Sequence, residues 1–214
     1  MLYHYRRLEY GEFIVVGCDT SAGLGDYSTA QFLSRTNLDV PMVYHSKGMA
    51  NEMTNKLHTV FNDVFNQTGI APMVAYERNN GGVFEMERLA ELNRLNKYRI
   101  FQMPSYGSVN NPLPRKLGWD TNTATRPKML SDLKDMIDKR LLKLYHRPTV
   151  DEMFSFIVTQ TSTTWKAQAE KGAHDDLVMS LAIAVQLYQN CEPESLIQED
   201  PPDDTQLFDE KGFY

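Results

Sequence analysis

Short apolar runs separated by small-residue turns dominate the first half of the chain. Residues 13–18 form such a run, which ends at Asp19 and predicts a buried strand. The next run partly alternates after a Gly-containing turn, so the two are expected to form a hairpin. Predicted strands in this half cover residues 13–18, 27–35, 40–46, 73–76 and 99–102. Helical spacing of apolar positions predicts helices over 51–67 and 83–95.

The second half opens with residues 103–127, which are rich in Pro, Gly, Ser and Asn and lack strong periodicity. They predict a long loop or a β-excursion, and segments of that kind are often functional. Beyond them we expect helices over 128–140, 149–158 and 176–190 and short strands over 141–146 and 164–169. Strands that alternate with helices after an opening meander predict an α/β fold, with a mixed central β-sheet and helices on both faces.

Composition and hydropathy limit the class of protein. Hydrophobic residues make up 42% of the 214 residues and charged residues 23%, which excludes a wholly disordered chain. No apolar run reaches the ~18 residues that a transmembrane helix needs. The first residues contain no apolar segment typical of a secretory signal. We therefore expect no membrane partner. Residues 1–191 are read as one domain and 192–214 as an acidic tail that is expected to be disordered.

The formal net charge of −6 argues at first against a nucleic-acid partner, because phosphate binding needs Lys and Arg. The charge is unevenly distributed, however. Residues 192–214 hold eight acids and one Lys, so residues 1–191 carry 21 bases against 20 acids. Residues 88–147 hold 13 bases and five acids, a local charge of +8. The charge therefore does not exclude DNA, but a DNA-binding face must be local and is expected to draw on residues 88–147.

Four carboxylates lie at the ends of predicted elements. Asp19 ends the first strand, Glu77 follows the fourth, and Asp175 and Asp176 open the last helix. Chemistry in open α/β sheets collects beyond the carboxyl ends of strands. Carboxylates that converge there repel one another and need cations, and an oxygen-only ligand set suits Mg²⁺ or Mn²⁺. Two such ions are a common device for phosphodiester cleavage.

Each of these acids also has a structural explanation that the sequence leaves open. Asp19 can begin a turn, and Glu77 can form a surface ion pair with Arg78 or Arg88. Asp175 or Asp176 can cap the last helix and interact with the positive end of its dipole. Spacing alone therefore does not decide between a metal site and four separate structural acids.

Four sequence blocks carry a family resemblance: GCDTSAGLGDYSTA (17–30), VAYERNNGG (74–82), LGWDTNTATRPKML (117–130) and GAHDDLVMSLAIA (172–184). In this order they resemble the nuclease domain of the large terminase subunit of tailed phages, over about residues 10–190. The resemblance implies an RNase H-like fold, related to Holliday-junction resolvases. It also implies a divalent-metal-dependent endonuclease that cuts concatemeric viral DNA during genome packaging, with Mg²⁺ or Mn²⁺ as cofactor and two ions in the active complex.

The resemblance assigns catalytic and metal-binding roles to Asp19, Glu77 and the pair Asp175–Asp176. Helical spacing brings Asp175 nearer the packed face, whereas the resemblance favours Asp176, so both remain candidates. Candidates for an outer shell around the metal site are Asp26, His174, Arg78 and, beside them, Asn79. For each of these, a structural role in a turn or at the helix start is an open alternative.

The basic stretch supplies the candidate DNA contacts, Arg115, Lys116, Arg126 and Lys128. Arg126 and Lys128 precede or open a predicted helix, where cations oppose the helix dipole. That placement favours an external anion, although a solvated helix start is the alternative.

The resemblance implies partners as well: double-stranded DNA, the terminase ATPase domain, the small terminase subunit and the portal, in the host cell cytoplasm. The chain contains no Gly-x-x-x-x-Gly-Lys-[Ser/Thr] motif, so we expect no ATPase activity and an isolated nuclease domain. Two alternatives stay open. A resolvase-like, structure-selective nuclease would prefer four-way junctions to linear duplex, and a non-catalytic docking module of a packaging motor would bind no metal.

Overall fold

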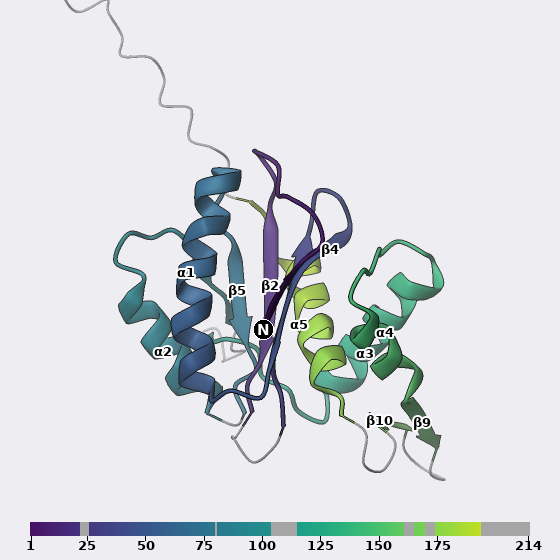
Figure 1. Ribbon diagram of the computed structural model, residues 1–214. Helices are drawn as coiled ribbons and strands as arrows, with labels where there is room; N and C mark the ends of the chain where they lie inside the picture. Colours follow the sequence, from purple (N-terminus) through teal and green to yellow (C-terminus); the bar gives the residue numbers. More distant parts are fainter. Residues whose placement is uncertain (22–25, 80, 104–114, 161–164, 170–173, 194–214) are drawn as a thin grey trace, which may run out of the picture.

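The computed structural model describes residues 1–21, 26–79, 81–103, 115–160, 165–169 and 174–193 (Figure 1). Its helices are α1 (Ala50–Thr68), α2 (Gly82–Leu92), α3 (Thr125–Asp138), α4 (Arg147–Phe154) and α5 (Asp176–Asn190). Its strands are β1 (Leu2–His4), β2 (Ile14–Asp19), β3 (Ser28–Ser34), β4 (Asp39–Ser46), β5 (Met73–Tyr76), β6 (Arg99–Ile100), β7 (Gln102–Met103), β8 (Lys116–Leu117), β9 (Phe156–Gln160) and β10 (Trp165–Ala169).

Six strands form the main sheet, in the order β1-β4-β3-β2-β5-β6. The pairs from β1 to β2 are antiparallel, whereas β2, β5 and β6 run parallel. Helices α1 and α2 cover one face of this sheet, and α5, backed by α3 and α4, covers the other (Figure 1). The predicted mixed sheet, helices on both faces and opening hairpin are thus confirmed.

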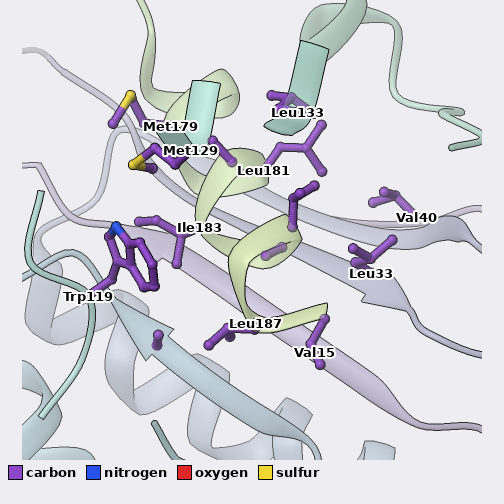
Figure 2. Packing of buried hydrophobic residues seen from close by; sticks show 14 of the residues in the cluster. Val15, Leu33, Val40, Trp119, Met129, Leu133, Met179, Leu181, Ile183 and Leu187 are labelled. Carbon is purple, nitrogen blue, oxygen red and sulfur yellow. The ribbon is translucent and has the colours of Figure 1, made fainter. Parts of the chain in front are cut away.

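Strand β2 shows how the sequence builds the two layers. Its side chains alternate, so that Val15 belongs to the apolar cluster on the α5 face and Ile14 and Val16 belong to the cluster on the α1 face. Helix α5 is buried at every position from Leu177 to Leu187, because it lies between the sheet and α3. Figure 2 shows this packing around Leu181, Ile183 and Leu187.

Gly17 allows α5 to lie directly on β2. A Cβ atom at this position would stand 2.1 Å from the carbonyl oxygen of Ser180 and 2.4 Å from the backbone nitrogen of Ala184. No side chain can therefore separate the two elements here. Because Asp19 lies two residues further along on the same side of β2, this close approach holds Asp19 on the face that α5 covers.

Two element predictions in the second half are wrong. Residues 141–146 form no strand; only Lys143 makes a bridge, with Asp39, because β1 occupies the edge of β4 from Met42 onward. The helix expected over 149–158 is α4, which ends at Phe154. The β-branched run that follows forms β9 instead and pairs with β10 in a separate two-stranded ribbon.

The expected excursion after residue 103 is bounded by a short antiparallel pair, β7 with β8, and residues 104–114 between them lie outside the described residues. Strand β1 has no counterpart among the predictions, and α3 begins three residues earlier than expected.

At the C-terminal end of the described residues, the Glu192 carboxylate forms two contacts with the Arg35 guanidinium, at 2.6 and 2.7 Å, while residues 194–214 lie outside the described part. None of the helices described has the length and apolar character needed to cross a membrane.

Candidate metal centre

Two buried carboxylates stand side by side where neighbouring parallel strands end. Cys18 of β2 is in register with Tyr76 of β5, so Asp19 and Glu77 follow as neighbours, and each residue is only 7% exposed. The backbone N–H of Glu77 donates to the Cys18 carbonyl at 2.8 Å, which extends the ladder to this point. Both residues continue the side of the sheet occupied by Val15 and Ala75, and therefore face α5.

The other two carboxylates come from the start of α5. Asp176 accepts a hydrogen bond from the backbone N–H of Tyr27 at 3.3 Å, and its carbonyl accepts one from the Thr29 hydroxyl at 2.8 Å. Asp175 pairs with the Arg126 guanidinium at 2.7 Å. Strand β3 and helix α3 thus fix the two acids in different directions. All four carboxylates, with Asp26, His174 and Arg126, line one pocket of about 450 Å³.

Burial and neighbouring carboxylates raise the pKa values of two acids in the pocket. Burial, the charge of Glu77 and a hydrogen bond with that carboxyl raise the pKa of Asp19 well above its ordinary value. Burial also raises the pKa of Asp176 to about 6; Asp175 adds to this effect and the Tyr27 N–H opposes it. A bound cation would relieve the same repulsion, so the pocket favours cations.

Glu152, which no sequence pattern singled out, belongs to the surroundings of this pocket. It lies in α4, and its Oε1 accepts a hydrogen bond from the backbone N–H of Val178 at 2.8 Å, in the first turn of α5. Burial raises its pKa to about 7, and the charges of Asp176 and Asp175 contribute. Glu152 therefore serves as the capping partner that α5 lacks from its own N-cap side chain. The sequence predicted a helix over 149–158, but its apolar pattern does not indicate that Glu152 binds the start of α5.

The candidates for an outer shell divide into two groups. His174 Nδ1 lies 3.7 Å from Asp176 and 3.8 Å from Asp26, and the Asn79 amide donates to Glu77 Oε1 at 3.1 Å and to the Thr121 carbonyl at 3.3 Å. These two therefore contact candidate ligands. The guanidinium of Arg78 instead donates to the carbonyl of Leu117 at 2.5 Å, so it holds β8 in place.

Most of the basic side chains expected to contact DNA are paired with acids. Besides Arg126, Lys128 pairs with Asp132 at 2.5 Å and Lys116 with Asp120 at 3.3 Å. Helix α3 carries three bases and three acids, so its charges balance. Arg115 is exposed beside β8. The local excess of +8 along the sequence is thus not a continuous unpaired basic face among the described residues, and the DNA contacts of these four residues stay a prediction.

Within the described ranges, no three His, Cys, Asp or Glu side chains already form a set that could hold a metal ion. Each acid has other partners here: Asp175 pairs with Arg126, Asp19 interacts with Glu77, and Asp176 accepts from the Tyr27 N–H. The pocket offers carboxylate oxygens, and divalent ions such as Mg²⁺ and Mn²⁺ prefer oxygen ligands.

Replacing Asp176 by Asn is expected to stabilise the metal-free protein at pH 7.5. An acid whose pKa is raised to about 6 in the folded state stabilises the fold below its ordinary pKa, and this contribution is lost as the pH rises through about 6. The variant should therefore exceed the wild type by about 2–3 kcal/mol at pH 7.5 and by little at pH 4. Urea unfolding in a chelator at both pH values measures this; equal differences at the two pH values would contradict it.

No family model matches the chain. A search of solved structures finds the large terminase nuclease from the thermophilic phage G20c, with 20% identity and a TM-score of 0.60 over 88% of this chain and 93% of that one. The chain has the fold of a large terminase nuclease domain. That fold is RNase H-like, as the resemblance implied.

Two further similar structures are less alike in sequence. The nuclease domain of the human cytomegalovirus terminase, soaked in Mn, is 11% identical with a TM-score of 0.53, over 85% of this chain and 90% of that one. The large terminase of a second thermophilic bacteriophage is 10% identical with a TM-score of 0.55. That match covers 86% of this chain but only 41% of the phage protein. The G20c nuclease has also been solved with bound magnesium.

Proposed function

We propose that the chain is a metal-dependent DNA endonuclease that cuts concatemeric viral DNA during genome packaging, by two-metal-ion phosphodiester hydrolysis. The observation that carries the proposal is the meeting of four carboxylates in one pocket: Asp19 and Glu77 from adjacent parallel strands, and Asp175 and Asp176 from the start of α5. The terminase nuclease fold of the chain supports the same reaction class.

The residues present fit divalent ions. Asp19, Glu77 and Asp176 would hold them, with Asp175 as a further ligand once it leaves Arg126. Burial and then neighbouring carboxylates raise the pKa of Asp19 and Asp176, and a bound cation would offset both effects. Similar nucleases solved with magnesium or soaked in Mn support this choice of ion. When bound, such ions activate the attacking water and stabilise the leaving oxygen.

The protein's own side chains set the orientation of the ligands. Asn79 fixes one oxygen of Glu77, and the Tyr27 N–H fixes one oxygen of Asp176. Arg126 neutralises Asp175, which limits the repulsion between the carboxylates. Hydrogen bonds of this kind on metal-binding carboxylates typically change metal affinity or activity by about 10–100-fold when removed.

The proposed partners follow from the same assignment. They are double-stranded DNA as substrate, and the terminase ATPase domain, the small terminase subunit and the portal as parts of the packaging motor, in the host cell cytoplasm. The second phage's large terminase supports an arrangement with further domains, since this chain matches only 41% of it. A separate domain or chain would supply the ATPase.

Titration of the protein with Mn²⁺ tests the metal centre directly. The wild type is expected to show binding heat. Glu77→Ala should lower the affinity for Mn²⁺ by at least ~10-fold, because a buried ligand is lost. Glu91→Ala, which removes an exposed carboxylate of α2, is the matched control and should bind like the wild type.

Plasmid nicking in Mn²⁺, stopped by a chelator, tests the reaction in parallel. A wild type that binds no Mn²⁺ and nicks no plasmid would favour a non-catalytic docking module. Preferred cutting of four-way junctions over linear duplex would replace packaging by a resolvase-like role.

A further inference from the structure

An exposed lysine lies beside the carboxylate pocket, at the end of the sheet where Asp19 lies. Ser46, the last residue of β4, is in register with Ser28, and Thr29 next to it is in register with Asp19. The connection from β4 to α1 therefore runs past the pocket. Lys47 is exposed on this connection, and its Nζ lies 5.0 Å from the centre of the Tyr27 ring.

Lys47 differs from the basic side chains that the sequence indicated. Across the residues that the structure describes, it has no carboxylate partner, whereas Arg126, Lys116 and Lys128 each pair with an acid. A phosphate that approaches Lys47 therefore displaces no ion pair of the described residues. Lys47 contacts the aromatic face of Tyr27, which a cation can keep while it binds an anion.

Tyr27 connects Lys47 to the pocket. Its backbone N–H binds Asp176, and its ring stands edge-on to His174 with centroids 5.4 Å apart, while His45 lies 4.2 Å from the same ring. His174 in turn lies 3.7 Å from Asp176. We call Tyr27, His45, Lys47 and His174 the Tyr27 ledge; its ring and cation contacts connect the exposed Lys47 to the carboxylates.

We propose that the Tyr27 ledge binds the DNA strand next to the cleaved bond, with Lys47 on a neighbouring phosphate. This inference rests on the proposed function and names the surface that the substrate uses. Without bound ions, a pocket of four carboxylates repels a polyanion, and a cation beside it helps to hold the strand in position. Lys47 lies over the ring of Tyr27, the residue whose backbone N–H binds Asp176, and no described acid neutralises its charge, which makes it well placed for this contact.

Duplex binding in a chelator tests the ledge without any need for cleavage. Lys47→Ala should weaken the binding of a labelled 20-base-pair duplex roughly 5-fold, equally for different sequences, and lower the slope of log affinity against log salt by about 1. Lys134→Ala is the matched control, since Lys134 is also exposed but pairs with Asp138 one turn away in α3. It should stay within about twofold of the wild type. Lys47→Arg should retain the affinity of the wild type.

Two results separate the ledge from the proposed function. If wild-type protein nicks plasmid while Lys47→Ala and Lys134→Ala bind duplex alike, the ledge proposal is overturned and the nuclease assignment stands. If Lys47→Ala weakens duplex binding selectively but the wild type does not cut in Mn²⁺, the ledge is a DNA-binding surface, but its place next to a cleaved bond is overturned together with the nuclease assignment. Unchanged Mn²⁺ binding by Lys47→Ala would further show that the lysine acts on DNA and not on the metal centre.

Discussion

Asp19→Asn is expected to abolish DNA cleavage, with a loss of at least ~10³-fold in the rate of plasmid nicking in Mn²⁺. Asp19 lies at the end of the central strand β2, beside Glu77 and opposite the start of α5, and the charges of the other three candidate ligands all act on it. Asn keeps its size but carries no negative charge and one oxygen fewer, which makes it a poor ligand for a hard divalent ion.

The same variant should remain folded, which keeps the test clear. Because the pKa of Asp19 is raised well above its ordinary value, the ionised side chain opposes folding at neutral pH, and a neutral amide removes that cost. The thermal midpoint in a chelator should therefore be no lower than that of the wild type. Asp63→Asn, an exposed change on α1, serves as the control for cleavage. Wild-type nicking by a folded Asp19→Asn protein would remove Asp19 from the catalytic assignment.

Features set by local pattern could be predicted from the sequence. The apolar run ending at Asp19 and the short strand before Glu77 placed both carboxylates at strand ends, and the parallel pairing of β2 with β5 then makes them neighbours. These strand ends follow from the short apolar run and from the first polar residue after it, which are local properties. The strongest helix, α5, was predicted with its observed bounds for the same reason.

Features set by tertiary contact could not be predicted in this way. The pairing of Arg126 with Asp175 joins residues 49 positions apart, and the bond from Val178 to Glu152 joins α5 to α4. Similarly, residues 141–146 have an apolar pattern compatible with a strand, but β1 already occupies most of the β4 edge. Which segment pairs with a strand edge or caps a helix depends on the whole fold, and local propensity does not contain that information.

The distribution of charge shows the same limit when function is predicted from the sequence. A count along residues 88–147 finds an excess of bases, but i to i+4 pairs in and around α3 neutralise several of them, including Lys128 and Lys134. Lys47 lies outside that window and beside the pocket, without an acidic partner among the residues described. The position of a cation relative to the reacting bond therefore matters more than the local sum of charges.

Gly17→Ala is expected to destabilise the protein by about 3 kcal/mol or more, the upper end for an overpacked core. The added methyl group would overlap the backbone of α5 at Ser180 and Ala184, and neither the helix backbone nor the central strand can move aside as a flexible side chain would. To relieve the overlap, α5 must shift away from β2. That shift also carries Asp176 away from Asp19, so cleavage should fall even at temperatures where the variant is folded.

Urea unfolding and plasmid nicking, measured together, check both parts of this expectation. Gly48→Ala is the matched control: its methyl group would come closest to the end of the Glu52 side chain, at 2.8 Å, which can rotate away. It should unfold within about 1 kcal/mol of the wild type and cut DNA normally. A Gly17→Ala protein with wild-type stability would show that α5 does not rest on β2 as described. One with lower stability but full activity would show that this contact does not set the distance between the carboxylates.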